Sequence, residues 1–409
     1  MLEPIEVSAE ELRHLVSERA LKGETVLLNM GPQHPSTHGV LRLLVELDGE
    51  QVLNVVPDIG FLHTGIEKNM EAKRYWQAEV MTDRMDYLNP IGNNLAYCLA
   101  VEKLTGLEVP PRAQAIRVIL AELQRISSHL VWLGTHLLDL GATSLFLYTF
   151  REREFILDIF EMVSGARMMT TYIRPGGLWR DVPDGFEETV RAFLKAFPRR
   201  LKQYEALVTK NPIYRDRTRR IGVLSKEDAM RWGVTGPMLR ASGVAYDTRK
   251  ARPYCGYEQY DFDIPTQESG DVYARYLVRV EEMRQSLRII KQALDNLPGG
   301  AVRSDDRRYM PPPREEIGVS MEALIRHFKF WTEGFAPPKG SAYAAVESPR
   351  GTLAVFIESD GTPHPYRVHV RTPSFANLQA LPLMAKGAMI ADLVAIAGSV
   401  DIVLGDVDR

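Results

Sequence analysis

The chain has 409 residues, of which 45% are hydrophobic and 25% charged, and its formal net charge at pH 7 is −3. These values are typical of a globular protein with a sizeable core, and they give no electrostatic reason to expect binding to nucleic acid. The only cysteines are Cys98 and Cys255. They provide no disulfide framework, and they are too few for an iron–sulfur cluster, which needs about four thiolate ligands.

The N-terminal region predicts one short helix followed by a small antiparallel sheet. Ser8 and Glu11 form a capping-box pattern, which predicts a helix over residues 9–20. The segments VLLNM, VLRLLVELDGE and QVLNVVPDI have the composition of strands, and Asp48-Gly49 is a hairpin signal between the last two. The loop GPQHPSTHG, residues 31–39, lies between the first two predicted strands.

The middle of the chain predicts a bundle of long antiparallel helices. One helix is expected over residues 65–85 and a second up to residue 104, followed by helices over residues 112–140, 143–168, 186–210 and 271–297. The most apolar stretch, residues 130–150, carries His136 and Asp139 near its middle, and Gly141 interrupts it. It therefore predicts a buried helix and a turn rather than a membrane span.

The last third returns to strands. Residues 211–270 look irregular, and the proline-rich segment PGGAVRSDDRRYMPPPREE marks a boundary near residue 300. After a helix over residues 321–331, SAYAAVES, GTLAVFIESDG and PYRVHVRT alternate as strands of a meander, and the tail is expected to be helical and then extended. We predict an α+β fold in which small N-terminal and C-terminal β elements flank a central helical bundle, divided at residues 1–63, 64–300 and 301–409.

Two histidines in the loop GPQHPSTHG allow three interpretations. His34 and His38 are four residues apart, a spacing that favours a shared metal on a helix, but Pro35 and Gly39 argue against a helix. A plain polar turn is the simplest interpretation. The third is a proton donor held at a loop tip, because the ordinary pKa of histidine, about 6.5, lies near cellular pH.

Two further segments carry candidate site residues. In the predicted helix over residues 112–140, His129, His136 and Asp139 share a face, so Asp139 either makes an internal ion pair or orients a histidine from another segment. The motif TDRMDYLNP places Tyr87 at a helix end, as part of a charged terminus or as a proton donor. The arginines of YIRPGGL and NPIYRDRTRR form either a solvated basic face or a docking surface.

The known sequence signatures of dinucleotide, P-loop, zinc-protease and serine-hydrolase sites are missing, so an enzyme of this size is expected to do its chemistry with a cofactor held elsewhere. The segments GPQHPSTHGVLRL, HTGIEKNMEAKRYWQ, DRMDYLNP, FREREFILDIFEMVSGARM, YIRPGGL, RPYCGYEQYDFDIP and GSVDIVLGDVDR, in this order, carry a resemblance that spans essentially the whole chain. They resemble the D-type, or 49-kDa-type, subunit of bacterial respiratory NADH:quinone oxidoreductase, complex I.

That family is related to the large subunit of nickel–iron hydrogenases, so the resemblance implies a hydrogenase-large-subunit-like fold. The four metal-binding cysteines of the hydrogenases correspond to Asp86, Asn89, Val403 and Asp406 here. A nickel–iron centre needs soft sulfur ligands. The resemblance therefore implies that this chain binds no metal and that the ancestral cavity serves another purpose.

In the family, that cavity binds the quinone headgroup beside the last iron–sulfur cluster, which a partner subunit carries. By this resemblance His38 and Tyr87 are the headgroup ligands and catalytic residues, with Asp139 as the partner of His38. Arg84 matches an arginine close to the partner's cluster. Met169 stands where the family often has a histidine near that cluster, and methionine cannot titrate.

The resemblance also implies the assembly. This chain would bind no cofactor itself; the iron–sulfur clusters, FMN and the NADH site would belong to other subunits. Expected partners are the small iron–sulfur (B-type) subunit, the C-type subunit, the ferredoxin-like (I-type) subunit, and the H-type membrane subunit with the rest of the membrane arm. The expected location is peripheral, on the cytoplasmic side of the bacterial plasma membrane, with quinone reduction coupled to proton translocation. The alternative is a structural bridging subunit with no direct role in quinone chemistry.

Overall fold

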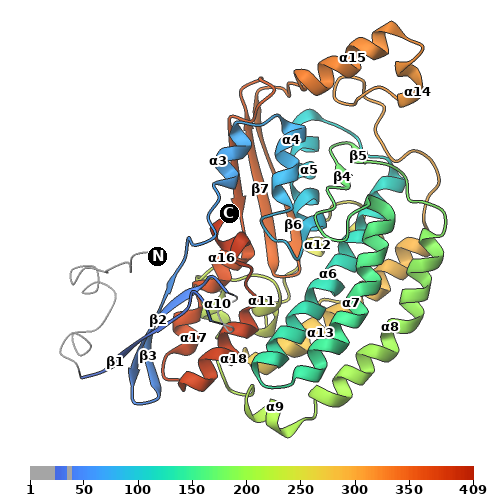
Figure 1. The fold of residues 1–409 in the computed structure, drawn as a ribbon. Coiled ribbons are helices and arrows are strands. Elements are labelled where there is room, and N and C mark those ends of the chain that lie inside the picture. The colour runs from blue at the N-terminus through green and yellow to red at the C-terminus, as the bar shows by residue number, and fades with distance from the viewer. Residues whose placement is uncertain (1–23, 35–38) are drawn as a thin grey trace.

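The computed structural model describes residues 24–34 and 39–409, so the predicted helix over residues 9–20 and His38 lie outside the described residues. A helical bundle fills most of the molecule, and small antiparallel sheets lie beside it (Figure 1). The predicted α+β class is confirmed, whereas the division of the chain at residues 63 and 300 stays a prediction. Within the described ranges, no helix has the length and apolar character that crossing a membrane requires.

The N-terminal sheet has the predicted strands in the order β1-β2-β3: β1 (Val26–Met30), β2 (Arg42–Asp48) and β3 (Gln51–Asp58). Asp48 pairs with Gln51 across a tight turn in which Gly49 has a φ of +61°, a conformation that favours glycine. The backbone of Val52 exchanges hydrogen bonds with Ala388 and Gly387. The C-terminal part of the chain therefore packs on the N-terminal sheet.

Five long helices form the bundle: α5 (Pro90–Thr105), α6 (Pro111–Asp139), α7 (Thr143–Ser164), α8 (Phe186–Val208) and α13 (Val272–Asp295). Helix α6 lies along both α7 and α13 (Figure 1). Its C-terminal turn at Gly141, with a φ of +90°, reverses the chain into α7 as predicted. At Gly134 a side chain would collide with Thr149 of α7, so glycine permits the close approach of these two helices.

Three expectations about element boundaries were wrong. The single helix predicted over residues 65–85 is two helices, α3 (Ile66–Glu71) and α4 (Tyr75–Thr82), because Arg74 between them has an extended backbone. Helix α7 ends at residue 164 rather than 168, because Gly165 takes a left-handed C-cap conformation. The last residues, expected to be extended, form the short helix α19 (Leu404–Asp408).

The segment that looked irregular contains several short helices, and the C-terminal region is mixed. The short helices are α9 (Pro212–Asp216), α10 (Lys226–Arg231), α11 (Pro237–Ala241), α12 (Thr248–Ala251) and η2 (Tyr257–Gln259). Two short strands, β4 (Ile173–Arg174) and β5 (Gly177–Leu178), pair after α7. The C-terminal elements are α14 (Arg314–Ile317), α15 (Met321–Thr332), the predicted meander β6 (Gly340–Ser348), β7 (Gly351–Ser359) and β8 (Arg367–Arg371), and α16 (Pro373–Leu378), α17 (Leu381–Ala385) and α18 (Ile390–Val400).

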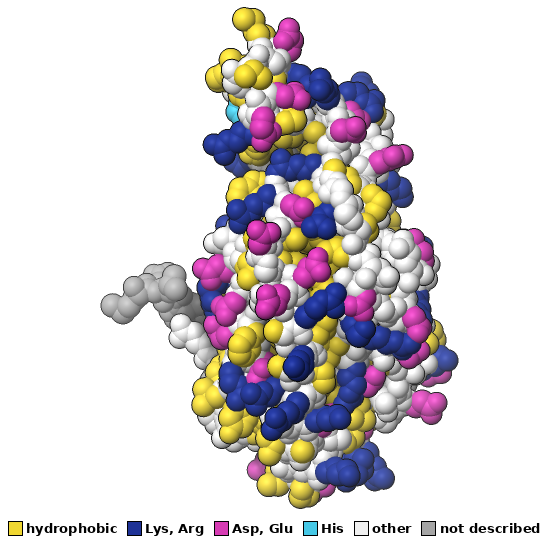
Figure 2. Space-filling view, turned by 90° about the vertical axis from the view of Figure 1, so that its right-hand side faces the viewer, with side chains coloured by type: hydrophobic (Ala, Val, Ile, Leu, Met, Phe, Trp, Pro, Cys, Tyr) yellow, Lys and Arg dark blue, Asp and Glu magenta, His cyan; other side chains and the backbone are white. Residues whose placement is uncertain are grey.

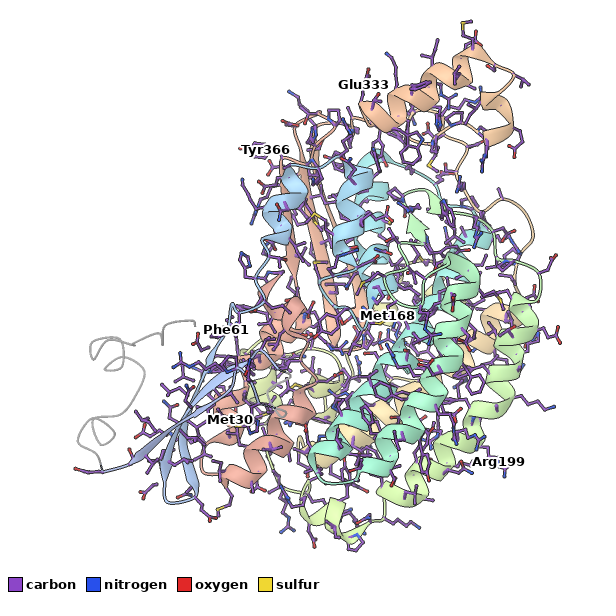
Figure 3. The ribbon with its side chains drawn as sticks, viewed as in Figure 1. Met30, Phe61, Met168, Arg199, Glu333 and Tyr366 are labelled. Atoms are coloured by element: carbon purple, nitrogen blue, oxygen red, sulfur yellow. The ribbon has the colours of Figure 1, made fainter. Side chains whose placement is uncertain are left out.

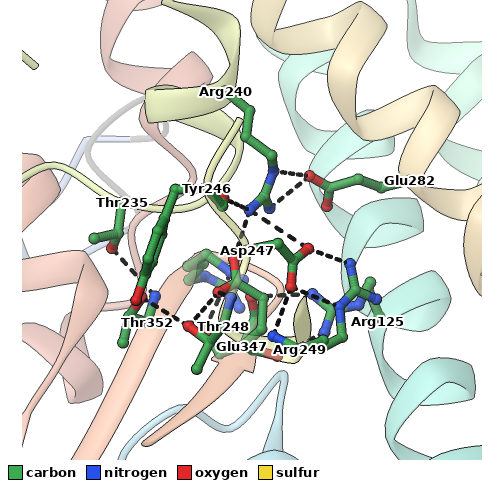
Figure 4. A network of polar contacts seen from close by, with 12 residues as sticks. Arg125, Thr235, Arg240, Tyr246, Asp247, Thr248, Arg249, Glu282, Glu347 and Thr352 are labelled. Carbon is green, nitrogen blue, oxygen red and sulfur yellow. Dashed lines mark hydrogen bonds and ion pairs between the residues drawn. The ribbon is translucent and has the colours of Figure 1, made fainter. Parts of the chain in front are cut away.

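A buried network of charges joins the bundle to the meander (Figure 4). Arg240 of α11 donates to the Glu282 carboxylate of α13 at 2.7 Å and to the Glu347 carboxylate of β6 at 2.7 Å. Arg249 of α12 bonds Asp247 at 2.6 Å and Glu122 of α6 at 2.9 Å. All of these side chains are buried.

The balance of charge in this network keeps the carboxylates of Glu122 and Asp247 ionised. Burial alone would raise the pKa of Glu122, but the neighbouring Arg249 and Arg125 lower it to about 2. The pKa of Asp247 is likewise lowered to about 2, because Arg249 outweighs the effect of burial. His129 contacts Glu282 at 2.9 Å, yet burial lowers its pKa to about 4, so it is neutral at pH 7.

Replacing Arg240 by methionine should destabilise the fold strongly, because it leaves the Glu282 and Glu347 carboxylates buried without their shared cation. We expect the free energy of unfolding to fall by about 3–5 kcal/mol in chemical denaturation. Arg288→Met, which removes exposed ion pairs to Asp261 and Asp263, should cost less than about 1 kcal/mol. Equal losses for the two variants would contradict the role assigned to the network.

Candidate functional site

Two segments far apart in sequence meet at the turn between α4 and α5. This turn carries the motif DRMDYLNP, and the C-terminal segment SVDIVLGDVDR packs against it. At Gly405 a side-chain carbon would lie 2.5 Å from the backbone oxygen of Met85 and 3.0 Å from that of Arg84. Glycine at this position therefore lets the two segments approach backbone to backbone.

Arg350, in the turn between β6 and β7, ties these segments together. Its guanidinium donates to the Asp86 carboxylate at 2.8 Å, and to the Asp401 carboxylate at 3.2 Å and backbone oxygen at 2.9 Å. It also donates to Ser128 of α6 at 3.1 Å. Arg350, Asp86 and Asp401 are all buried. One cation thus holds carboxylates from both segments.

A third buried carboxyl group, Asp406, shares this site. Burial and the negative charge of Asp86 raise the pKa of Asp406 to about 7, and hydrogen bonds from Ser374 oppose the rise. Burial also raises the pKa of Asp86 and of Asp401, although the charge of Arg350 opposes both shifts. The site can therefore hold a proton at neutral pH, and Asp406 is the group that keeps it most readily.

Tyr87 follows Asp86 in the turn and is half-buried. Burial raises the pKa of its hydroxyl, and the charge of Asp86 adds to this effect while Arg350 opposes it. The hydroxyl is therefore protonated at neutral pH. It can act as a hydrogen-bond donor.

Asp139 lies at the C-terminal end of α6, close to Gly398 of α18. The ideal Cβ position at Gly398 is 3.6 Å from the Asp139 carboxylate and 3.1 Å from Nδ1 of His136. Burial raises the pKa of Asp139 to about 6, and the charge of His34 opposes this rise. His34, which received no role from the sequence, is thus near enough to act on Asp139. The predicted pairing of Asp139 with His38 stays a prediction.

His136 is buried and stacks on Trp132, with the ring centroids 5.2 Å apart. Burial, together with the nearby Arg279 and Arg275, lowers its pKa to about 3. Neither ring nitrogen has a hydrogen-bond partner within the described residues. The neutral imidazole therefore fills space between α6 and α18 rather than forming the ion pair considered for Asp139.

Arg84 and Met169 lie on segments that the structure ties to each other. Arg84 is exposed, Met169 is half-buried, and a hydrogen bond from Thr171 to Asp83 joins the loop after α7 to the turn that carries Arg84. In Figure 3, Met168 lies near the middle of the view, whereas Met30 lies in the N-terminal sheet. The two residues assigned to the neighbourhood of a partner's cluster are therefore linked through their segments.

Two features of this region were missed by the sequence analysis. No sequence motif marked Arg350, because its turn meets Asp86 and Asp401 only in the folded chain. Glu79 of α4 is buried and lies 3.6 Å from Arg174, and burial raises its pKa to about 8. Asp83, the C-cap of α4, is also buried and lies four residues after Glu79, and that spacing could have drawn attention to a buried acidic pair.

The four positions matched to hydrogenase cysteines provide no thiolate. Asp86 bonds Arg350 and Asp406 accepts from the backbone of Ser374, while Val403 is apolar. Residues 24–34 and 39–409 contain no group of three or more His, Cys, Asp or Glu side chains arranged to hold a metal ion. The oxygen and nitrogen atoms of this site can form hydrogen bonds and exchange protons.

The basic segments have different surroundings. Arg174 of YIRPGGL lies beside the buried Glu79, whereas Arg219 and Arg220 of NPIYRDRTRR are exposed. Figure 2 shows Lys and Arg side chains on the lower half of the face that carries α8, with acidic and apolar side chains between them. This mixture is typical of a solvated face.

Fold and site together define a mixed α and β protein with a helical bundle and a buried acid–guanidinium site where two distant segments meet. Residues 139–409 match the family model described as respiratory-chain NADH dehydrogenase, 49 Kd subunit. The chain is 63% identical to the D 2 subunit of NADH-quinone oxidoreductase from Roseiflexus sp., over 96% of each chain. It is 60% identical to the D 2 subunit from Chloroflexus aurantiacus over 100% of each chain, and 55% identical to the D subunit from Thermus thermophilus over 99% of this chain and 98% of the relative.

This chain therefore belongs to the 49 kDa subunit family of respiratory-chain NADH dehydrogenases, which comprises the D-type subunits of complex I. The resemblance stated from its motifs is confirmed.

Replacing Asp406 by asparagine should change how stability depends on pH. A raised pKa means that the folded state binds a proton more tightly than the unfolded state, so the contribution of Asp406 to the stability of the wild-type protein is lost as pH rises from about 4 to about 7. Asp406→Asn removes this ionisation, so relative to wild type its free energy of unfolding should increase from about pH 4 to about pH 7. The exposed Asp305→Asn should follow the wild-type curve. A curve for Asp406→Asn that is parallel to wild type would contradict the raised pKa.

Proposed function

We propose that this chain forms the quinone headgroup site of a proton-translocating NADH:quinone oxidoreductase, beside the terminal iron–sulfur cluster of a partner subunit. The observation that carries the proposal is the position of Tyr87. It directly follows Asp86, which belongs to the buried site of Asp86, Arg350 and Asp406. The relatives, which are named as D-type subunits of NADH-quinone oxidoreductase, support the substrate.

Reduction of a quinone to a quinol takes two electrons and two protons. The partner's cluster supplies the electrons, and this chain supplies hydrogen-bond donors to the two carbonyl oxygens. Tyr87 donates to one carbonyl and His38 to the other, which polarises the ring and delivers protons as negative charge develops. Asp139 orients the imidazole of His38 and favours its charged form.

Arg84 and Met169 face the partner's cluster in this proposal. The exposed guanidinium of Arg84 places a positive charge there, which favours the reduced cluster. Met169 cannot titrate, so its side chain gives the cluster no proton-linked potential. On the preceding helix, α4, the buried Glu79 lies 3.6 Å from Arg174, and burial raises its pKa to about 8.

The proposed place of the chain is in the peripheral arm, on the cytoplasmic side of the bacterial plasma membrane. The small iron–sulfur (B-type) subunit carries the cluster, the C-type and I-type subunits complete the arm, and the H-type membrane subunit guides the quinone tail. NADH and FMN bind elsewhere in the complex. Quinone reduction at this site is coupled to proton translocation by the membrane arm.

Replacing Tyr87 by phenylalanine tests the proposal against a purely structural, bridging role. Loss of the donor hydroxyl should lower NADH:quinone turnover of the assembled complex by about 100-fold or more. Assembly and NADH oxidation by an artificial soluble acceptor should be unchanged, and the exposed Tyr366→Phe should behave as wild type. Wild-type turnover of Tyr87→Phe with short-chain quinones would remove Tyr87 from the reaction and favour the bridging role.

Replacing Asp139 by asparagine tests the second donor. Because the pKa of Asp139 is raised to about 6, its carboxylate becomes protonated as pH falls below 6. Wild-type turnover should decrease over the same pH range. Asp139→Asn should be slower at pH 7.5 and should lack this acidic limb of the pH profile. If the variant keeps the wild-type rate and the same limb near pH 6, Asp139 does not support the donor.

A further inference from the structure

The meander has a free edge along β6. In the described residues its three strands lie in the order β6-β7-β8, so β6 pairs with β7 on one side only. Ser348 pairs with Gly351 across a two-residue turn, which makes this a hydrogen-bonded pair. Hydrogen-bonded and non-hydrogen-bonded pairs alternate along an antiparallel strand. Residues 343, 345 and 347 therefore direct their backbone N–H and C=O groups away from β7.

One end of this edge is already covered. The Glu347 N–H donates to the hydroxyl of Tyr254 at 3.1 Å, and its carbonyl accepts from Arg125 at 2.6 Å. The carbonyl of Tyr343 accepts from the exposed Lys103 at 3.3 Å. In the part of the chain that the structure describes, the N–H and C=O of Ala345 and the N–H of Tyr343 have no such partner.

These free groups face a cavity of about 850 Å³. Its walls come from β6, the C-terminal end of α5, the start of α6 and the segment after α12, including Tyr343, Ala345, Lys103, Gln114 and Arg252. Tyr343 is 43% exposed. The cavity therefore gives an incoming chain access to the middle of the strand edge.

We propose that this edge receives an extended segment of a partner subunit, which adds a fourth strand beside β6. An extended backbone presents donors and acceptors at the spacing of the free groups, and strand addition to an open edge is a recurrent mode of peptide recognition. Uncovered edges promote aggregation, so a subunit of a stable assembly gains from covering one. In the lining of the cavity Glu102 is paired with Arg117, and the exposed charges are the cations Lys103 and Arg252 and the anion Glu108. The exposed lining therefore has a net positive charge, so the added segment carries a carboxylate that faces Lys103 and Arg252.

This inference requires the chain to belong to an assembly but not the quinone site, so enzyme activity is not its readout. The first measurement is amide hydrogen exchange of the full chain, alone and in the assembled complex. Exchange at Tyr343 and Ala345 should slow by at least about 100-fold on assembly, because a fourth strand would bind these amides. The amides of Ala344 and Val346, already in the ladder with β7, are the internal control.

The second measurement compares two variants of one residue. Ala345→Pro removes the outward N–H without touching the ladder to β7, and proline is tolerated at strand edges. Ala345→Val keeps the N–H and serves as the matched control. Ala345→Pro should weaken recovery of partner subunits with the tagged chain at least tenfold, and Ala345→Val should not.

Exchange that is equal in the two states overturns the proposal, and it decides the question even if Ala345→Pro fails to fold. Protection that appears in the isolated chain and grows with its concentration also overturns it, because the occupant is then a second copy of this chain. Equal recovery of partners by folded Ala345→Pro and Ala345→Val has the same consequence.

Discussion

Three buried guanidinium groups, Arg125, Arg240 and Arg249, connect the helical bundle to the meander. They bind the carboxylates of Glu122, Asp247, Glu282 and Glu347, which come from α6, the segment before α12, α13 and β6. Buried charges are costly unless each has a partner, so this set is favourable only when all of these elements are in register. The network thereby fixes the position of the meander on the bundle.

That constraint extends to the candidate site through one turn. Arg125 of α6 donates to the carbonyls of Glu347 and Ser348, the last residues of β6, and the next residues form the turn that carries Arg350. Because the strand end is held on α6, the guanidinium of Arg350 reaches both Asp86 and Asp401. The site is therefore built on the rigid junction of bundle and sheet, although its acids lie in loops.

The sequence predicted what is local and missed what depends on distant contacts. The strands 26–30 and 340–348 and the long helices follow from periodicity, and the turns at Gly49 and Gly141 follow from the conformations that only glycine adopts easily. The break at Arg74 was missed because no glycine or proline marks it in the sequence. The motifs named Tyr87 and Asp139 as candidates, which stay predictions, but no pattern could place Arg350, which bonds Asp86 across 264 residues.

The charges of the site explain why the pKa of one of its acids, Asp406, is close to neutral pH. Two cations, Arg350 and Arg279, face three carboxyl groups, Asp86, Asp401 and Asp406, and Arg279 reaches Asp401 only at 4.0 Å. If all three acids were ionised, the buried site would carry one uncompensated negative charge. Protonation of one acid removes that charge, and Asp406, with a pKa of about 7, has backbone and hydroxyl partners rather than a direct ion pair. A reaction that takes up two protons beside Tyr87 would draw on surroundings that exchange a proton at little cost in free energy near pH 7.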